Sequence, residues 1–168
     1  MPVHFDGSCR CGAISFSVHS HTPHPYQLCY CTICRKTAGG GGYAINFMAI
    51  AGTLEITGKE ALAIYQARIE EEGQDGVCRL QTNPAQRHFC SRCASALWLF
   101  DPRWPELMHP FASAIDSELP VPPERVHLML RYKAGWVQPG FGPRDLRFED
   151  YPEQSIEDWH RSRGLWVE

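Results

Sequence analysis

The segment Cys29-Tyr30-Cys31-Thr32-Ile33-Cys34 places three thiols within six residues. One further cysteine pair precedes this segment and another follows it, at CxC and CxxC spacing respectively. The flanking cysteines are Cys9, Cys11, Cys90 and Cys93. Seven of the eight cysteines in the chain therefore lie in short clusters of the kind that binds metal ions. We predict that two metal sites organise the fold.

The overall composition limits the classes to which the chain can belong. Its 168 residues predict a single domain over residues 1–168, and 43% hydrophobic residues suffice for a core. The net charge of −3 argues against a nucleic-acid or anionic-membrane surface. No apolar run approaches the roughly 20 residues of a membrane-spanning helix, and the first residues do not resemble a signal peptide. We therefore expect a cytoplasmic protein, in a compartment that keeps thiols reduced.

An even number of cysteines could also form a disulfide framework. Such frameworks are typical of small secreted domains, whereas CxC and CxxC pairs in a cytosolic chain indicate metal or redox chemistry. We therefore favour zinc. A redox pair formed by Cys31 and Cys34, and an iron site, remain alternatives.

Hydrophobic patterning predicts a mainly β fold with short strands. We expect strands over residues 13–19, 43–50, 53–57, 77–82, 96–100, 111–115 and 125–132. Residues 62–67 fit either a strand or a short helix. We expect loops at residues 19–25 and around the central cysteines, and a solvated turn at residues 70–76.

A short helix is predicted near the C-terminus. Ser155 can cap its start, with Asp158 at the capping-box position, and Gly164 can end it. Ile156 and Trp159 would then lie on one face, which the core can cover.

The two flanking cysteine pairs fit a closed metal site. Cys9 and Cys11, with Cys90 and Cys93, supply four thiolates from two short segments, which is the arrangement of structural zinc sites. The metal would join the N-terminal strand to a segment far along the chain. Because such a site does not exist in the unfolded chain, its binding energy acts as folding energy.

The central cluster has one ligand fewer. Cys29, Cys31 and Cys34 have no fourth cysteine or histidine close by in the sequence. Three protein ligands and one open position are typical of catalytic zinc sites. Three thiolates leave a zinc centre with net negative charge, which suits the binding of a soft thiol better than the generation of hydroxide.

The residues after this cluster fit a substrate that carries carboxylates. Arg35 and Lys36 could bind such carboxylates, and the glycine run 39–42 would let the backbone approach closely. The alternative is a second structural metal, completed by Cys78 or a distant histidine. For Cys78, which has no cysteine at metal-ligand spacing, we expect a buried and inert position instead.

These motifs resemble the glutathione-dependent formaldehyde-activating enzyme family, which includes the centromere-protein-V-like proteins. The resemblance rests on the order and spacing of seven cysteines within segments 7–12, 29–36 and 89–93. It implies a β-tent fold, in which small antiparallel sheets surround zinc. It also implies addition of glutathione to formaldehyde, the reaction of a carbon–sulfur lyase.

The resemblance further implies two Zn²⁺ ions per chain. A structural zinc would bind the four flanking cysteines, and a catalytic zinc would bind Cys29, Cys31 and Cys34. Two positions depart from the family pattern: Tyr30 stands where histidine is common, and Ala94 stands where glycine is common. The first change removes a candidate proton carrier beside the zinc, and the second can alter a turn.

We therefore predict a zinc-dependent carbon–sulfur lyase that joins a small-molecule thiol, such as glutathione, to a small aldehyde. A non-catalytic, zinc-stabilised binding module is the main alternative. A zinc-ribbon nucleic-acid binder is disfavoured by the acidic charge balance, so nucleic acid and membrane are not expected partners.

Overall fold

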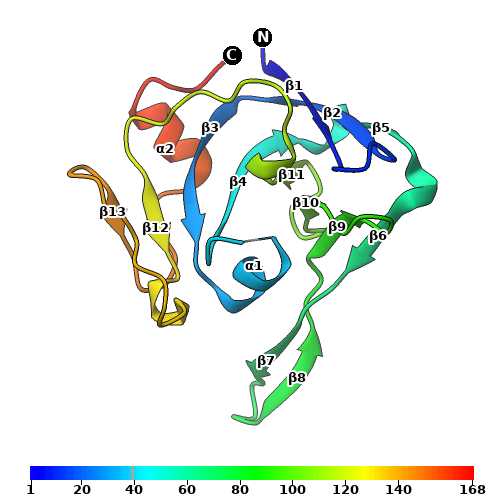
Figure 1. Ribbon diagram of the computed structural model, residues 1–168. Helices are drawn as coiled ribbons and strands as arrows, with labels where there is room; N and C mark the ends of the chain where they lie inside the picture. The colour runs from blue at the N-terminus through cyan, green and yellow to red at the C-terminus, as the bar shows by residue number, and fades with distance from the viewer. Residues whose placement is uncertain (39) are drawn as a thin grey trace.

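The computed structural model describes residues 1–38 and 40–168, and within them the chain is mainly β (Figure 1). The predicted fold class, small antiparallel sheets with a short C-terminal helix, is confirmed. The first glycine of the predicted run 39–42 lies outside the described residues. No helix among the described residues combines the length and the apolar character needed to cross a bilayer.

Thirteen strands and two α-helices are assigned within the described residues. The strands are β1 (Val3–Ser8), β2 (Ser15–Ser20), β3 (Thr22–Cys29), β4 (Ala44–Ile50), β5 (Glu55–Thr57), β6 (Leu62–Tyr65), β7 (Arg68–Glu72), β8 (Cys78–Thr82), β9 (Gln86–Cys90), β10 (Ala96–Phe100), β11 (Leu107–Pro110), β12 (Val126–Leu128) and β13 (Leu146–Arg147). The α-helices are α1 (Thr32–Thr37) and α2 (Ile156–Ser162), and short 3₁₀ helices span Ala51–Thr53, Lys59–Ala61, Ala112–Ala114 and Leu130–Tyr132.

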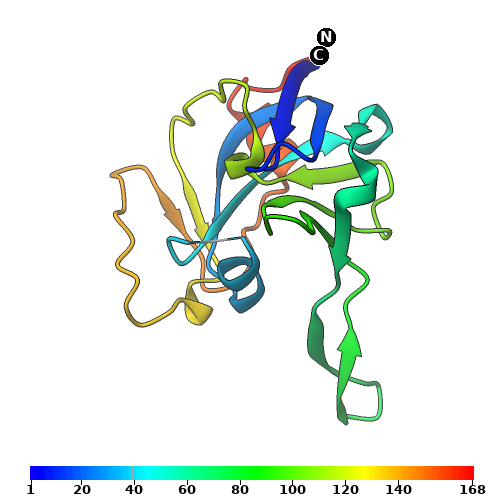
Figure 2. The same cartoon turned by 45° about the vertical axis from the view of Figure 1, so that its right-hand side comes forward.

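The strands form three sheets. β1, β2 and β5 make one antiparallel sheet, and β7 and β8 make a separate hairpin. The largest sheet has the order β13-β12-β3-β4-β11-β10-β9-β6, and β12 pairs in parallel with both of its neighbours. Figures 1 and 2 both place α1 between the β3 and β12 side and the β9 and β10 side. The end of β3 and the start of α1 therefore face β9 across the molecule.

The main core lies between the three-stranded sheet and the middle of the largest sheet. Phe16 and Trp98 meet edge to face with ring centroids 5.0 Å apart, and Phe5 and Phe47 do so at 5.3 Å. Each such pair contributes about 0.5–1.5 kcal/mol beyond the area it buries. A Cβ atom at Gly7 would lie 2.5 Å from the Phe16 ring, so this position requires glycine. The alternating apolar residues of the predicted first strand thus supply this core.

Several predicted elements differ from the structure. Residues 19–25 were expected to form a loop, but Thr22–Cys29 is strand β3. Its two prolines are tolerated because the β3–β4 register shifts between Thr22 and Gln27, where a missing N–H is not needed for pairing. The strand expected at residues 111–115 is instead the 3₁₀ helix Ala112–Ala114. The strand expected at residues 125–132 ends at Leu128 because Met129 adopts a positive φ of 61°.

The β7–β8 hairpin extends away from the rest of the molecule (Figure 2). All five residues of β8 are exposed, including Cys78. The expectation of a buried Cys78 is therefore wrong, because the hairpin carries it away from the core. Residues 70–72 are exposed as predicted, although they extend β7 and the turn begins only after Glu72. Residues 62–67 resolve into the short strand β6.

Helix α2 matches its prediction. The Ser155 hydroxyl accepts a hydrogen bond from the Asp158 amide and donates one to the Asp158 carboxylate, which caps the helix start. Trp159 is buried and stacks on Tyr26 with ring centroids 3.7 Å apart. Gly164 has a φ of 66°, the left-handed conformation that commonly ends a helix. The helix thereby covers β3, the strand that leads into the central cysteines.

Candidate functional site

The four flanking cysteines come together. Cys9 and Cys11 follow β1, whereas Cys90 ends β9 and Cys93 lies in the next turn. The Sγ atoms of Cys9 and Cys11 are 3.6 Å apart, and those of Cys11 and Cys90 are 3.8 Å apart. Sulfur atoms arranged tetrahedrally around zinc at about 2.3 Å lie about 3.8 Å from one another. The donor set and its spacing therefore fit a metal ion, and we call these residues the four-thiol cluster.

Two similar turns hold the four-thiol cluster. The Gly12 amide donates to the Cys9 carbonyl at 3.0 Å, and the Ala94 amide donates to the Cys90 carbonyl at 2.8 Å. Both turns need a positive φ, which is 76° at Gly12 and 60° at Ala94. The Ser95 hydroxyl accepts a bond from the Arg10 amide at 3.0 Å, which ties one turn to the other.

Hydrogen bonds favour the thiolate form at two members of the four-thiol cluster, Cys9 and Cys93, whereas the pKa of Cys11 is raised to about 11. The Ser95 hydroxyl lies 3.2 Å from Cys93 Sγ, and its contact is the main cause that lowers the pKa of Cys93 to about 5. The Ile14 amide donates to Cys9 Sγ at 3.2 Å. Since thiolate is the form that binds metal, these contacts prepare the cluster for an ion.

The three central cysteines also come together, on a strand end and a helix start. Cys29 ends β3, Cys31 is the N-cap of α1, and Cys34 lies in the first turn of that helix. The Cys34 amide donates to Cys31 Sγ at 3.3 Å. The expected loop is therefore mostly regular structure, because the Cys31 side chain caps α1 as a serine would. We call these residues the three-thiol cluster; their Sγ atoms lie within 4.8 Å of one another.

The negative charge of the three-thiol cluster resides mainly on Cys31. Hydrogen bonds from Cys29, the larger cause, and from Cys34 lower the pKa of Cys31 to about 2. The same contact with Cys31 raises the pKa of Cys29 above its ordinary range. Protons are therefore shared unequally among the sulfurs, and a bound cation would stabilise all three as thiolates.

Two residues far away in the sequence adjoin the three-thiol cluster. Arg87, on β9, places Nη2 3.5 Å from Cys34 Sγ and donates from Nη1 to Thr37 Oγ1 at 3.3 Å. Although Tyr151 is 75% exposed, partial desolvation of its hydroxyl and then the charges of the three thiols raise its pKa. Sequence analysis missed the role of both positions, because nothing in local spacing links them to the cysteines. Only the closeness of Arg87 to the last cysteine pair hinted at a site.

Tyr30, one of the two departures from the family pattern, does not lie free beside the cluster. Its side chain is buried with Leu28 and Val137, and its hydroxyl is 2.9 Å from His127 Nδ1. His127 Nε2 is in turn 3.1 Å from the Asp145 carboxylate. Burial is the main cause that raises the pKa of Tyr30 to about 12. Position 30 therefore anchors the cysteine segment to β12 and to the turn before β13.

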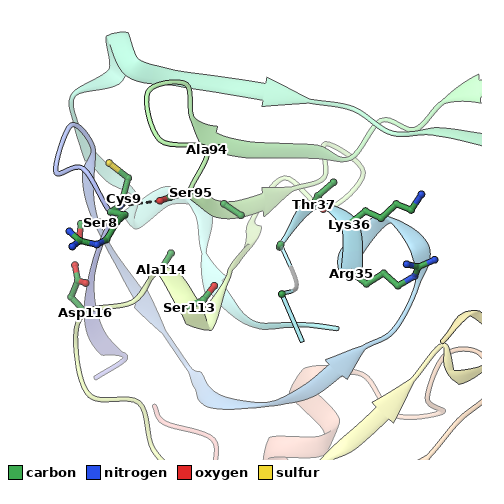
Figure 3. Close-up of a pocket in the computed structure, with 14 residues that line it drawn as sticks. Ser8, Cys9, Arg35, Lys36, Thr37, Ala94, Ser95, Ser113, Ala114 and Asp116 are labelled. Atoms are coloured by element: carbon green, nitrogen blue, oxygen red, sulfur yellow. Dashed lines mark hydrogen bonds between the residues drawn. The ribbon is translucent and has the colours of Figure 1, made fainter. Parts of the chain in front are cut away.

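A cavity of about 790 Å³ lies between Cys9 and helix α1, and we call it the polar cavity (Figure 3). Its wall near the four-thiol cluster includes Ser95 and Asp116, and its opposite end includes Arg35 and Lys36. Figure 3 shows the charged ends of Arg35 and Lys36 extending from α1 away from Cys9 and Ser95. The charged ends of both side chains therefore point out of the polar cavity, and a carboxylate would meet them beyond its α1 end.

Two comparisons with known proteins, one with a family model and one with a curated relative, give the same family description. The family model described as glutathione-dependent formaldehyde-activating enzyme matches residues 4–130. The chain is 59% identical to a Halomonas elongata protein whose name carries the same description, over 160 residues that cover 95% of this chain and 96% of that protein. A crystal structure of a Rhodobacter sphaeroides protein covers 85% of this chain and 98% of its own, at 20% identity and a TM-score of 0.48.

Proposed function

Because the chain belongs to the glutathione-dependent formaldehyde-activating enzyme family, we propose that it joins a small-molecule thiol to a small aldehyde as a carbon–sulfur lyase. The thiol is glutathione or a close relative, and the aldehyde is formaldehyde or another small aldehyde. The reaction forms a bond between the thiol sulfur and the carbonyl carbon, and the thiol proton ends on the former carbonyl oxygen. The same site can run the addition in reverse.

The proposal includes two zinc ions per chain with different roles. The four-thiol cluster, Cys9, Cys11, Cys90 and Cys93, would hold a structural ion, and Cys29, Cys31 and Cys34 would hold a catalytic one. When bound to three thiolates, zinc supplies a Lewis-acidic centre that keeps a soft thiol ionised at neutral pH. The observation that carries the proposal is the difference in ligand number. Within residues 1–38 and 40–168, no fourth histidine, cysteine, aspartate or glutamate joins the three-thiol cluster.

The neighbouring side chains would bind and orient the substrates. Arg35 and Lys36 would bind carboxylates of the thiol just beyond the α1 end of the polar cavity, where their charged ends point, with arginine as the more specific partner. The Arg87 guanidinium beside Cys34 Sγ offsets part of the negative charge of the cluster. Tyr151, whose hydroxyl is affected by the charges of the three thiols, would donate a hydrogen bond to the oxygen that develops charge. The dependence on reduced thiols fits a cytoplasmic location.

Metal stoichiometry and turnover, measured together under reducing conditions, test the proposal. Wild-type protein should contain two zinc ions and should speed the formation of the glutathione–formaldehyde adduct, followed by NMR with ¹³C-labelled formaldehyde. Cys31→Ser should lose one ion and the activity but keep the fold, since serine preserves the cap of α1. Cys78→Ser, which removes an exposed thiol outside both clusters, is the matched control and should retain two zinc ions and the activity. Two tightly bound ions without any turnover would instead support a binding module.

A further inference from the structure

A second cavity adjoins the polar cavity on the side of β9. Its volume is about 350 Å³, which lies at the lower end of the range for small-molecule sites. Both cavities are lined by Thr37, Ala94 and Ala96. The second one is otherwise walled mainly by aromatic side chains, which are Tyr65, Phe89 and Phe111. We call it the apolar cavity, and the two together form a cleft with one polar and one apolar arm.

Arg87 connects the apolar cavity with the three-thiol cluster. This residue lines the cavity, while its Nη2 lies 3.5 Å from Cys34 Sγ. Its Nη1 donates to Thr37 Oγ1, and Thr37 lines both cavities. Through Arg87, one wall of the apolar cavity therefore lies against the sulfur of Cys34, although none of the three central cysteines lines either cavity. A group attached to the reacting carbon can extend along Arg87 into this space.

Formaldehyde leaves the apolar cavity unused. Its carbonyl carbon carries only hydrogen atoms, so it has no apolar group to bury among aromatic rings. A larger aldehyde carries an alkyl or aryl substituent on that carbon, and burying this substituent would stabilise the adduct. The addition itself is unchanged: a sulfur–carbon bond forms, the carbonyl π bond breaks, and the thiol proton ends on the oxygen. No oxidant or reductant is needed.

We infer that the apolar cavity binds the apolar substituent of an aldehyde larger than formaldehyde. The substrate range then includes short aliphatic and aromatic aldehydes, with the thiol held in the polar cavity. This inference rests on the proposed function, since it assigns a substrate group to the apolar arm of the same cleft.

Binding of unreactive adduct analogues tests the inference without turnover. In an S-alkylglutathione, the first alkyl carbon stands for the aldehyde carbon and the rest of the chain stands for its substituent. S-butylglutathione carries three methylene groups more than S-methylglutathione, and complete burial strengthens binding about fourfold for each. Because the cleft is open, burial is incomplete. We therefore expect calorimetry to show that S-butylglutathione binds on the order of tenfold more tightly than S-methylglutathione, which is less than the product of three fourfold factors.

A pair of matched variants locates the effect. Tyr65, which lines the apolar cavity, and Tyr132, which lies outside both cavities, are each 46% exposed. Tyr65→Glu should reduce the preference for the butyl chain to less than about twofold, because a carboxylate makes the cavity wall polar. Tyr132→Glu should leave the preference at the wild-type value. Thermal unfolding of both variants checks that each is folded.

The outcomes separate this inference from the proposed function. One outcome would overturn the inference and leave the proposed function intact. In it, the protein turns over formaldehyde, but S-butylglutathione binds no more tightly than S-methylglutathione and kcat/KM for butanal is no higher than for formaldehyde. A gain that survives in Tyr65→Glu would also overturn it, since the chain would then bind elsewhere. Loss of turnover with every aldehyde, together with no analogue binding, would defeat the proposed function and this inference with it.

Discussion

The four-thiol cluster and the three-thiol cluster use the same side chain but differ in what holds the sulfur atoms. Two turns far apart in the sequence form the first, so its sulfurs meet only when β1 and β9 are in place. A single strand end and the helix that follows it form the second, with a cap inside the helix itself. Under the proposed roles, long-range closure would make metal binding part of folding, whereas local closure would leave the metal free to serve chemistry.

The largest expected effect comes from breaking each cluster in turn. Cys90 is fully buried, and Cys90→Ser should lower the free energy of unfolding by more than about 5 kcal/mol, since structural zinc binding is worth about 10–16 kcal/mol in small domains. Cys31→Ser should cost only about 1 kcal/mol, because α1 keeps its cap. Urea unfolding followed by tryptophan fluorescence measures both. Equal losses would mean that the two clusters have the same structural role.

Acid release of metal from the two clusters can be compared by measuring stability against pH. This requires that the pH dependence of the rest of the fold is known first. His160 is buried; it donates from Nδ1 to the Ile156 carbonyl at 2.8 Å and accepts at Nε2 from the His24 amide at 3.2 Å. Burial is the main cause that lowers its pKa to about 4. Because the unfolded chain then binds more protons than the folded one, stability is complete above pH about 6.5 and falls between there and pH 4.

This loss should be on the order of 3 kcal/mol in the wild-type protein. His160→Gln removes the titrating group, so its unfolding free energy should change less over the same window. The difference between the two curves isolates His160 from acid release of the metals, which affects both proteins alike. Parallel curves would show that groups other than His160, such as His88 and His109, whose pKa values are also lowered by burial, set the acid response.

The anchor beneath the three-thiol cluster gives a smaller effect. Tyr30→Phe removes the hydroxyl that meets His127 Nδ1 and leaves a buried polar atom without that partner. We expect a loss of about 1–2 kcal/mol of unfolding free energy, with both metal ions retained. Tyr43→Phe is the control, since this hydroxyl has no hydrogen bond to His127 and should cost a few tenths of a kcal/mol. Loss of the second metal in Tyr30→Phe would show that the anchor, and not the helix start, positions the cysteines.

Sequence patterns predicted what depends on local spacing. The grouping of the seven cysteines and the capped helix α2 are both found in the structure, because each follows from residues a few positions apart. The role of Arg87 and the anchor of Tyr30 by His127 depend on pairing between distant strands, which no local pattern contains. Cys78 was misjudged because β8 belongs to a hairpin that leaves the core. The strand β3 was missed because prolines normally interrupt pairing.

The smallest expected effect on stability concerns the two turns of the four-thiol cluster. Each contains a residue with positive φ, but one is Gly12 and the other is Ala94. A Cβ atom at Gly12 would meet nothing within 4 Å, so Gly12→Ala should cost only backbone strain, about 1 kcal/mol. Ala94→Gly should gain a similar amount, about 0.5–1 kcal/mol, because glycine adopts this conformation without strain. This gain exceeds the cost of the larger conformational entropy that glycine gives the unfolded chain.

Thermal unfolding of both single variants and of the double variant measures these shifts, and the two effects should nearly cancel in the double variant. A destabilised Ala94→Gly would mean that the methyl group, which lines both cavities, packs usefully there and that the departure from glycine serves the cleft rather than the turn.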